Sequence, residues 1–426
     1  MLMRTDSTSV MDIVGIGFGP SNLGLAIAVD EHNRSVGPAE QISAVFVEAK
    51  PEFAWHPGML LPGTTMQISF LKDLVTQRNT TSEYSFLSYL AERGRMAHFI
   101  NHQTFFPTRH EFHDYLAWAE RKVGADVHYG TRASSITEAD GHLIVHATGP
   151  AGPVTVNTRN VVVAGGLRES LPTGVTASPR QFHNHRLLDH LAALPATDNN
   201  RFVVVGAGQS AAEVVEYLHD NYPSAQIHNV FAKYGYVPAD DSPYANRIFD
   251  ATAVDEFYEA DRTQRDSLLQ YHRSTNYSCV DLDLIRELYR REYAEHVAGD
   301  RRLFMRGASR VADVVETDDA VRVRVENLLN GEIDSMTVDA VVYATGFVPT
   351  DLSELLGDLV EPGVTAGDVD RDYRVVTTRP VAGAVYTQGG TEHTHGLTSS
   401  LLSNIAIRSG EILESVVAGR SLSRTA

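Results

Sequence analysis

The residues whose types and spacing most directly suggest chemistry form a glycine-rich turn near the start of the sequence. Gly15 and Gly17 permit a tight turn and the close approach of a pyrophosphate, and a helix starting just after them would offer its free N–H groups. Glu48, at the end of the next apolar stretch, stands where an acidic residue can hold a ribose hydroxyl. The fit to G-x-G-x-x-G is imperfect, because Pro20 replaces the third glycine and Gly19 comes one position early. The turn still predicts a dinucleotide site.

A second turn of the same kind lies about 190 residues further along the chain. Gly206, Gly208 and Ala211 match G-x-G-x-x-A. The strand expected after this turn leads to Ala232 and Lys233 rather than to an acidic residue, and a basic side chain there suits the 2′-phosphate of NADPH. One such motif is weak, because turns without a ligand also match it. Two motifs, each between an apolar strand and a helix, are much stronger.

Parallel strands must position these two turns, and the sequence supplies suitable apolar runs. Two further runs, which start at Asn160 and Val338, stop at small residues, and they are interpreted as strands from which the chain passes between two domains. We therefore predict an α/β fold with two Rossmann-like dinucleotide-binding domains, for FAD and NADPH, and a small, mostly helical substrate-binding region. The expected order is an FAD-binding domain at 1–166, an NADPH-binding domain at 167–239, the helical region at 240–300, the rest of the NADPH-binding domain at 301–335 and the rest of the FAD-binding domain at 336–426.

Composition argues against several other classes of protein. The chain has 36 basic and 54 acidic residues and a net charge of −18, which disfavours nucleic-acid binding. No run of about 18 apolar residues occurs, so we expect no membrane span, and the polar stretch Met1–Val10 lacks a signal-peptide apolar region. A single cysteine, Cys279, rules out an internal disulfide and is interpreted as a packed side chain rather than a nucleophile. Together these features favour a cytoplasmic protein.

Histidine is the residue type that raises the question of a metal site, since the chain has 18 of them. The closely spaced pairs are His183 with His185 and His393 with His395. Neither pair comes with a metalloenzyme signature such as H-E-x-x-H. We therefore predict no metal.

Seven segments carry a resemblance to a known family, and together they span nearly the whole chain. They are Gly15-Ile-Gly-Phe-Gly-Pro-Ser-Asn, Trp55-His-Pro-Gly-Met, Met66-Gln-Ile-Ser-Phe-Leu-Lys-Asp-Leu, Gly206-Ala-Gly-Gln-Ser-Ala-Ala-Glu, Asp240-Asp-Ser-Pro-Tyr-Ala-Asn, Thr275-Asn-Tyr-Ser and Ala344-Thr-Gly-Phe. The segment from Met66 is highly specific, whereas the glycine motifs are shared with many flavoproteins. The chain resembles the microbial N-hydroxylating class B flavin monooxygenases that act on ornithine or lysine, and it is most similar to the bacterial L-ornithine N5-monooxygenases.

The resemblance implies a particular reaction. FAD is reduced by hydride from NADPH, the reduced flavin adds O₂ to give a C4a-hydroperoxide, and an uncharged side-chain amine attacks the distal oxygen. The expected product is N5-hydroxyornithine, formed by hydroxylation of the delta amine of L-ornithine for siderophore or related biosynthesis. The resemblance also implies a homo-oligomer, often a tetramer.

Other activities stay open at this point. The same family contains L-lysine N6-hydroxylases and diamine N-hydroxylases, and a one-carbon difference in chain length is worth only about 1–3 kcal/mol in a pocket. Ketone- or sulfide-oxidising flavin monooxygenases share both glycine turns, but their F-x-G-x-x-x-H linker pattern is not found here. A non-catalytic flavin-binding protein is the third class.

The resemblance assigns four residues to the substrate. Lys72 and Asn246 would bind its carboxylate, Asn276 its backbone end, and Ser403 would line the same pocket. A cation and two amides suit a free amino acid, which carries a carboxylate and an α-ammonium group. The apolar residues from Ile68 onward would bury the stem of Lys72, although a solvated surface lysine is the alternative. The two asparagines could instead cap helices or turns.

The predicted catalytic set is Gln67, Lys72 and Asn276. The Gln67 amide would hydrogen-bond the flavin or the carboxylate-binding loop rather than transfer protons, because an amide does not titrate usefully. The turns and the resemblance together predict the following cofactor-binding residues: Gly15, Gly17, Gly19, Pro20, Glu48, Trp55, His56, Gln67, Arg109, Gly206, Gly208, Gln209, Ser210, Lys233, Tyr277, Thr345, Gly346 and Leu402.

Some of these assignments compete with ordinary structural roles. Trp55 and His56 could form a core aromatic with a hydrogen-bonded histidine instead of lying against the flavin. Ser210 could cap its helix. Arg109 could form a surface salt bridge.

Overall fold

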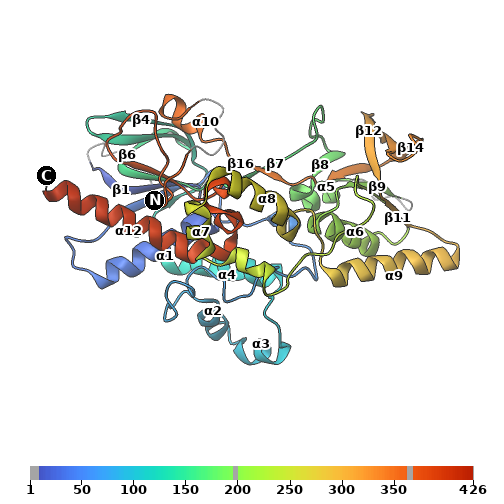
Figure 1. Cartoon of the computed structure of the whole chain (residues 1–426), viewed down its shortest axis with the longest axis horizontal. Helices are drawn as coiled ribbons and strands as arrows, with labels where there is room; N and C mark the ends of the chain where they lie inside the picture. The colour runs from blue at the N-terminus through green and yellow to red at the C-terminus, as the bar shows by residue number, and fades with distance from the viewer. Residues whose placement is uncertain (1–8, 195–199, 362–367, 426) are drawn as a thin grey trace.

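The computed structural model describes residues 9–194, 200–361 and 368–425. Each of its two halves is built on a parallel sheet with helices packed around it (Figure 1). The α/β class predicted from the sequence is therefore confirmed. We call the part built on β1 the first half and the part built on β9 the second half.

The sheet of the first half is centred on β1 (Met11–Ile16), which is buried along almost its whole length. It pairs in parallel with β2 (Ala44–Val47) on one side and with the second part of β6 (Gly152–Val163) on the other. β3 (Val127–His128) lies beyond β2, and β17 (Ala384–Thr387) pairs in parallel with β6. Strands from both ends of the chain thus meet in one sheet.

Helices and an antiparallel extension complete the first half. The first part of β6 continues into a meander with β5 (His142–Gly149) and β4 (Arg132–Ala139). α1 (Pro20–Ser35) packs against α12 (Ile405–Thr425), and α4 (Arg109–Val123) packs against α1. The approach of α1 to α12 depends on Gly24, because a side chain there would crowd Ile405.

The second half contains a sheet of five parallel strands. Their order is β11 (Leu303–Arg306), β10 (Gln226–Val230), β9 (Arg201–Val205), β15 (Ala340–Tyr343) and β8 (Gln181–His183). β9 and β15 are continuously apolar at their centres, as is typical of strands covered on both faces.

Helices and a small antiparallel sheet flank these parallel strands. α6 (Gln209–Asn221) follows β9, and α9 (Leu282–Ala298) packs against α6 and β11. The antiparallel sheet consists of β12 (Ser309–Glu316), β13 (Val321–Asn327) and β14 (Ile333–Val338).

Two antiparallel linker strands join the halves (Figure 1). β7 (Leu167–Glu169) leads out of the first half and β16 (Phe347–Pro349) leads back. The boundary predicted at residue 336 is therefore too early, because β15 comes after it and pairs with β8 and β9. An apolar strand shows that it is buried, but it does not show which sheet it joins.

The region predicted as one helical unit at 240–300 is not one unit in the structure, because its elements pack on two different parts of the molecule. η3 (Ala245–Phe249) packs on η5 (Leu397–Ser400), and α7 (Ala253–Glu259) and α8 (Arg262–Asn276) pack on α11 (Glu392–His395). Its last helix, α9, belongs to the second half. Only the part before α9 is a separate covering layer.

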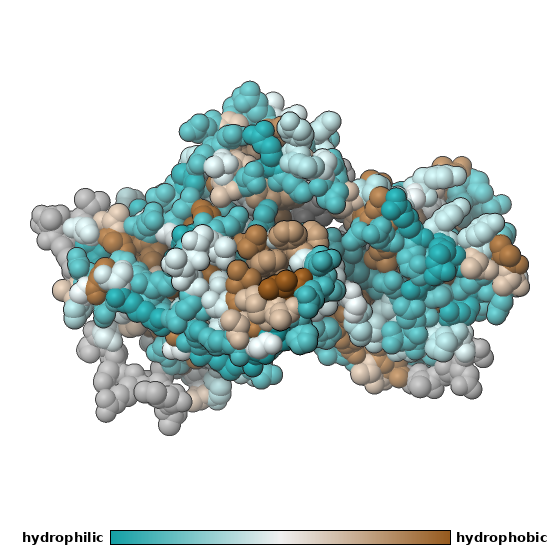
Figure 2. Space-filling view, turned by 90° about the horizontal axis from the view of Figure 1, so that it is seen from below, coloured by the Kyte–Doolittle hydropathy of each residue, from teal (hydrophilic) through white to brown (hydrophobic). Residues whose placement is uncertain are grey.

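The remaining short elements complete the two halves. They are η1 (Pro57–Met59), α2 (Phe86–Glu92), α3 (Met96–His102), η2 (Asn184–Arg186), α5 (Leu187–Ala193), α10 (Ser353–Leu356), η4 (Gly357–Leu359) and η6 (Leu402–Asn404). Seen from the side of α2 and α3, apolar side chains gather near the centre of the surface (Figure 2). Exposed apolar residues of this region include Ile100, Phe105 and Phe106. Among the described residues, no helix is long and apolar enough to cross a membrane.

Candidate active site

Two glycines shape the turn between β1 and α1, each for a different structural reason. Gly17 has a φ of +83°, which disfavours a side chain, and a Cβ there would collide with the carbonyl oxygen of Ala164. A Cβ at Gly15 would overlap the ring of Phe46 on the neighbouring strand. Gly19 is different, since a Cβ there would meet no protein atom within 4 Å. The open side of the turn is therefore at Gly19, at the start of the helix.

The N-terminus of α1 is left available for an anion. Its N-cap is Gly19, no described side chain caps it, and its first turn has no acidic residue. Glu48 is buried below the turn and accepts hydrogen bonds from the backbone N–H groups of Phe18 (2.7 Å) and Lys50 (2.8 Å). Uncapped N–H groups and the positive end of a 16-residue helix suit a phosphate.

The second turn repeats this design at the start of α6. Gly206 has a φ of +142°, and a Cβ there would collide with the carbonyl oxygen of Ala344, the residue after β15. The N-cap is Gly208, and within the described part of the chain no side chain caps the helix. Ser210 lies in the first turn, and none of the described residues forms a hydrogen bond with its hydroxyl. These residues fit the pyrophosphate of a second dinucleotide.

Trp55 and His56 lie where the two halves meet. The ring of Trp55 packs edge-on against Phe112 of α4, with 5.9 Å between ring centroids. His56 packs against His185 of the second half at 5.1 Å and near Phe347 of the β16 linker. Burial, and then the charges of His185, Arg109 and Lys50, lower the pKa of His56 to about 3, so that its ring is neutral at pH 7.

The loop that carries Gln67 and Lys72 is fixed to the segment before α4 by main-chain hydrogen bonds. Met66 donates to Pro107 (2.9 Å), and Phe70 donates to Phe105 (2.8 Å). Gln67 is exposed, and no hydrogen bond within the described residues restrains its amide.

Lys72 is half-buried, and none of the described residues offers its ammonium group a hydrogen bond or an ion pair. The neighbouring carboxylate, Asp73, is turned inward and accepts hydrogen bonds from Val75, Thr76 and Phe86. Burial raises the pKa of Asp73 against these bonds. Lys72 is thus a cation whose nearest acid in sequence is already occupied, which suits an incoming carboxylate.

The structure brings two other predicted substrate residues onto adjacent segments. Asn246 is exposed on η3, where its amide nitrogen donates to the Asp241 carbonyl at 2.9 Å. Ser403 is buried, with its hydroxyl 3.4 Å from that of Thr398, and Thr398 in turn donates to the Phe249 carbonyl of η3. No contact among the described residues joins either of them to Lys72. Asn276 ends α8, and its side chain lies outside the described residues.

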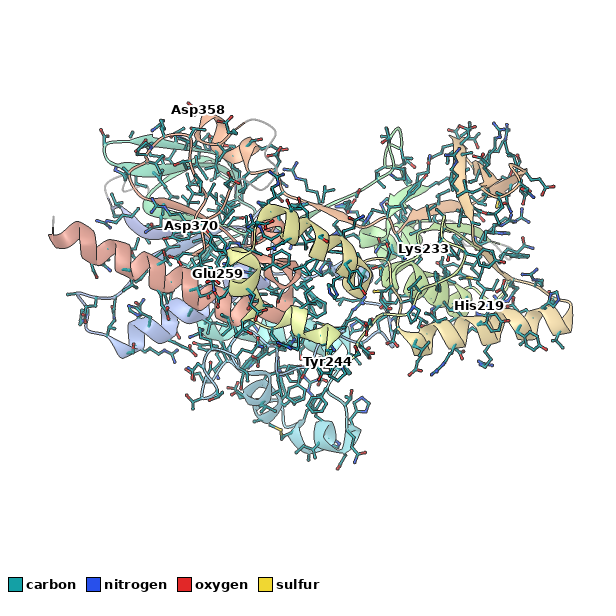
Figure 3. All side chains as sticks on the ribbon, viewed as in Figure 1. His219, Lys233, Tyr244, Glu259, Asp358 and Asp370 are labelled. Carbon is teal, nitrogen blue, oxygen red and sulfur yellow. The ribbon has the colours of Figure 1, made fainter. Side chains whose placement is uncertain are left out.

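The 277–281 loop covers the second glycine turn. Lys233 donates to the carbonyl of Ser278 at 2.6 Å, and the N–H of Asp281 donates to Gln209 at 2.8 Å. Tyr277 hydrogen-bonds Glu392 of α11. Lys233 lies in the second half, as Figure 3 shows, at the edge where β10 ends. Its predicted contact with a 2′-phosphate would require it to leave Ser278 or to serve both groups.

Three of the remaining predicted cofactor residues lie at junctions between segments. The Thr345 hydroxyl donates to the Ser170 carbonyl, and Gly346, with a φ of +84°, follows at the start of the return linker. Leu402 is half-buried against the core of the first half.

Arg109 does not point to solvent. Its two terminal nitrogens donate to the two carboxylate oxygens of Glu213 on α6, at 2.7 and 2.8 Å. The expected alternative, a surface salt bridge, is wrong in one respect, because the Glu213 side chain is only 3% exposed. Glu213 was missed among the candidate residues. The only signal for it in the sequence is a carboxylate placed in the apolar start of a helix.

One member of each histidine pair contacts other groups of the protein. His183 hydrogen-bonds the Gly346 carbonyl at 2.8 Å, and the buried His395 contacts Thr394 and the Arg371 carbonyl. Across the described part of the chain, no three His, Cys, Asp or Glu residues are placed to share a metal ion. Cys279 is buried, and burial raises the pKa of its thiol.

Comparisons with known proteins agree with this geometry. The sequence model of the L-lysine 6-monooxygenase/L-ornithine 5-monooxygenase family matches residues 9–349. An L-ornithine N(5)-monooxygenase of Pseudomonas aeruginosa is 34% identical over 97% of this chain and 95% of the relative. One from Burkholderia cepacia is 37% identical over 91% and 90%.

Solved structures give the same result. An ornithine N-hydroxylase of Kutzneria sp. 744, described with reduced FAD, NADP⁺ and L-ornithine, has a TM-score of 0.91 and 44% identity, and covers 97% of this chain and 100% of that one. An L-lysine 6-monooxygenase of Pseudomonas syringae has a TM-score of 0.82 and 32% identity, and covers 95% and 99%. This chain therefore belongs to the L-lysine 6-monooxygenase/L-ornithine 5-monooxygenase family, as its motifs indicated.

Proposed function

We propose that this chain is an NADPH- and FAD-dependent monooxygenase that hydroxylates the delta amine of L-ornithine to N5-hydroxyornithine. FAD would bind at the β1–α1 turn of the first half and NADPH at the β9–α6 turn of the second half. The observation that carries the proposal is the similarity, over 97% of the chain, to an ornithine N-hydroxylase described with both cofactors and L-ornithine. Two uncapped helix N-termini in one chain support it independently.

The flavin would pass the electrons of NADPH to O₂, so that one oxygen atom enters the amine and the other leaves as water. The protein's own task is to bind, orient and exclude water. Glu48 would hold the FAD ribose, and Ser210 and Lys233 would contact NADPH phosphates. Gln67 lies on the same loop as Lys72 and would hold this loop at a fixed position relative to the flavin.

Lys72 is the residue that favours an amino acid over a diamine. Its half-buried ammonium has no partner among the described residues, and a substrate carboxylate would supply one. Asn246, Asn276 and Ser403 would bind the rest of the amino-acid backbone. L-lysine is the second candidate, because the family and one solved relative include lysine monooxygenases.

The cellular setting extends this proposal. We propose a cytoplasmic enzyme of siderophore or related biosynthesis that works as a homotetramer. Its single cysteine suits a reducing compartment. The exposed apolar side chains of the α2–α3 side and the row of Tyr289, Tyr293 and Val297 on α9 are surfaces that association could cover.

Product analysis tests the proposed reaction. The purified enzyme with NADPH, FAD and air is given L-ornithine, L-lysine or putrescine, and hydroxylamine product is measured beside NADPH oxidation and H₂O₂. We expect coupled product from L-ornithine, and NADPH consumption that ends mostly in H₂O₂ with putrescine. Equal coupling with putrescine would show that the enzyme does not require a substrate carboxylate.

Lys72→Ala tests the substrate site. We expect the ornithine KM to rise about 10- to 150-fold, since a charge-assisted contact contributes about 1.5–3 kcal/mol. Flavin reduction by NADPH should stay nearly unchanged, and more NADPH oxidation should end in H₂O₂. Lys122→Ala is the matched control, because Lys122 pairs with Glu92 on the surface of the first half. An unchanged ornithine KM in the Lys72 variant would contradict the assignment.

A further inference from the structure

A buried ion pair crosses between the two halves. Arg109 is the first residue of α4 in the first half, and Glu213 lies on α6 in the second half, 104 positions away. The guanidinium and the carboxylate meet through two parallel hydrogen bonds of 2.7 and 2.8 Å. This two-point geometry fixes both distance and orientation, which a single contact does not.

Arg109 is anchored directly to the loop of the proposed substrate site. Its backbone N–H donates to the carbonyl of Thr64 at 3.0 Å, and the preceding residue, Thr108, forms a β-bridge with Thr65. Met66 donates to Pro107 in the same ladder. Gln67 follows immediately, so a shift of Arg109 moves the start of the Gln67–Lys72 segment.

Glu213 is anchored to the proposed coenzyme site on its other side. Gln209, the first residue of α6, donates from its amide to Glu213 at 2.9 Å. The oxygen of the same amide accepts from Asp281 in the 277–281 loop. One carboxylate thus holds the first turn of α6, the loop over that turn and, through Arg109, the first half of the molecule.

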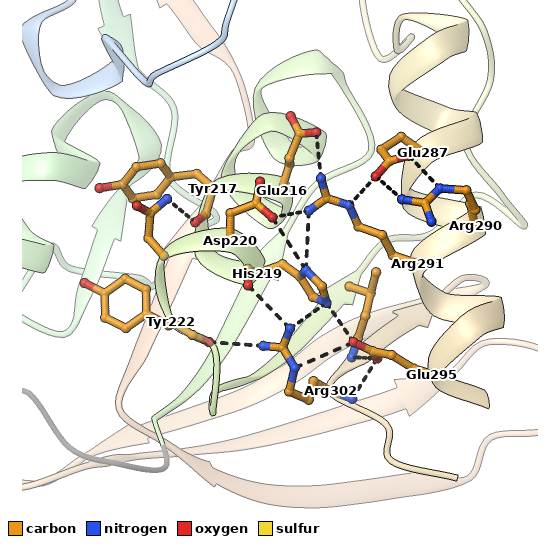
Figure 4. Close-up of polar contacts among 12 residues, drawn as sticks. Glu216, Tyr217, His219, Asp220, Tyr222, Glu287, Arg290, Arg291, Glu295 and Arg302 are labelled. Carbon is orange, nitrogen blue, oxygen red and sulfur yellow. Dashed lines mark hydrogen bonds and ion pairs between the residues drawn. The ribbon is translucent and has the colours of Figure 1, made fainter. Parts of the chain in front are cut away.

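The energetics make this arrangement sensitive to the loss of either partner. Burial raises the pKa of Glu213, and the charge of Arg109 acts in the opposite direction, favouring the ionised form. Removing one member of such a pair leaves an uncompensated buried charge, which is more damaging than losing a surface pair. A second cluster, around Arg291, Glu216 and His219, ties α6 to α9 (Figure 4), but it lies wholly within the second half.

We infer that Glu213 is a positioning residue, and that its ion pair with Arg109 sets the distance between the coenzyme site and the flavin site. Hydride transfer requires the reacting atoms to come within about 3–3.5 Å, so a small displacement of α6 costs rate even when the coenzyme stays bound. The kinetic part of this inference rests on the proposed function, whereas the structural part does not.

The test compares Glu213→Gln with Glu216→Gln. Both changes remove one carboxylate from α6 and keep its shape, but only the first removes the charge pair and one of the two hydrogen bonds between the halves. Anaerobic stopped-flow gives the maximal rate of flavin reduction and the NADPH Kd. Hydrogen exchange, measured on the protein without NADPH, follows residues 64–66, the first turn of α4 and the 277–281 loop.

We expect Glu213→Gln to lower the maximal reduction rate about tenfold or more, with the NADPH Kd changed less than about threefold. Residues 64–66 and the 277–281 loop should lose protection from exchange, while β9 and β10 keep theirs. Glu216→Gln should resemble the wild type in all three measurements. The charge-swapped pair Arg109→Glu with Glu213→Arg should regain most of the lost rate.

Wild-type reduction rate in Glu213→Gln would overturn the inference, whatever the exchange pattern. So would equal effects of the two glutamine variants. If Glu213→Gln does not fold, Arg109→Lys keeps the charge but loses the two-point contact, and an unchanged reduction rate in that variant would be equally decisive. If the wild type forms no hydroxylamine, the proposed function fails, while loss of exchange protection in Glu213→Gln still supports the contact between the halves.

Discussion

At the scale of single residues, the glycines of the first turn have two different roles, although the sequence motif does not distinguish them. Some are needed for packing, and another leaves room for a ligand. Gly15 is required because Phe46 occupies the space of a side chain, and Gly17 because of its positive φ and the carbonyl of Ala164. Only Gly19 faces open space at the helix N-terminus. A change at Gly15 therefore reports on packing, and a change at Gly19 reports on whatever binds there.

Two alanine variants test this distinction. Gly15→Ala should destabilise the protein by about 1–3 kcal/mol through overpacking against Phe46, with loss of FAD as a consequence. Gly19→Ala should keep the free energy of unfolding within about 1 kcal/mol of the wild type but bind FAD more weakly. Urea unfolding of the apoprotein and FAD titration measure the two effects separately. Full FAD affinity in Gly19→Ala would show that no phosphate of FAD binds against Gly19 in this turn.

The same scale shows which site residues a sequence can reveal. The partial burial of Lys72 could be predicted because its own neighbours, from Ile68 onward, indicate a buried stem, whereas its contact with the substrate stays a prediction. Glu213 could not, because a buried carboxylate becomes reasonable only when a cation lies beside it, and Arg109 is distant in sequence. The sequence predicted either a cofactor contact or a salt bridge for Arg109. The fold shows a salt bridge, which joins two helices, and the cofactor contact stays a prediction.

At the scale of elements, apolar runs predicted the strands well and their partners poorly. The apolar stretch that ends at Glu48 and the strand expected before Ala232 became β2 and β10, beside the expected glycine turns. The run from Val338 became β15, which joins the second sheet rather than the first. Strand pairing depends on contacts far along the chain, and the two linker strands that decide it are only three residues each.

The 277–281 loop gives the prediction that belongs to this scale. Lys233 ties this loop to the end of β10 and is also the proposed 2′-phosphate contact. Lys233→Ala should weaken NADPH binding about tenfold, because a charge-assisted contact is lost. NADH lacks that phosphate, so only the change in the loop can affect it, and its binding should change less than about twofold.

Titration of the variant and of the wild type with NADPH and with NADH makes the comparison. Equal weakening of NADPH and NADH would mean that Lys233 acts only by holding the loop. In that case the 2′-phosphate contact belongs to another basic residue.

At the scale of the whole molecule, two electrostatic effects oppose each other as the pH falls. The net charge of −18 at pH 7 becomes less negative, which relieves repulsion within the folded chain. Buried neutral histidines act the other way. Burial lowers the pKa of His56 to about 3 and those of His228 and His395 to about 4. These three residues lie at the junction of the halves, in the second sheet and beside α12.

The histidines should dominate below neutral pH. Their pKa values are lower in the folded than in the unfolded chain, where histidine titrates near about 6.5, so the unfolded state binds more protons. Their contribution to stability is complete above about pH 6.5 and is lost as the pH falls towards 4 and then 3. Each contributes a slope of up to about 1.4 kcal/mol per pH unit, whereas relief of surface repulsion is spread over many screened charges.

His228→Phe isolates one of these contributions without disturbing the others. His228 stacks on Phe304 at 4.5 Å between ring centroids, and its Nε2 has no hydrogen-bond partner among the described residues. Its Nδ1 accepts a hydrogen bond from Arg306 at 3.2 Å, so a phenyl ring keeps the stacking and loses this one bond at both pH values. Urea unfolding at about pH 7 and about pH 5 should show a smaller loss of stability in the variant, by up to about 2 kcal/mol over that interval. If the variant and the wild type lose the same stability, folding does not lower the pKa of His228, and this residue does not contribute to the acid sensitivity.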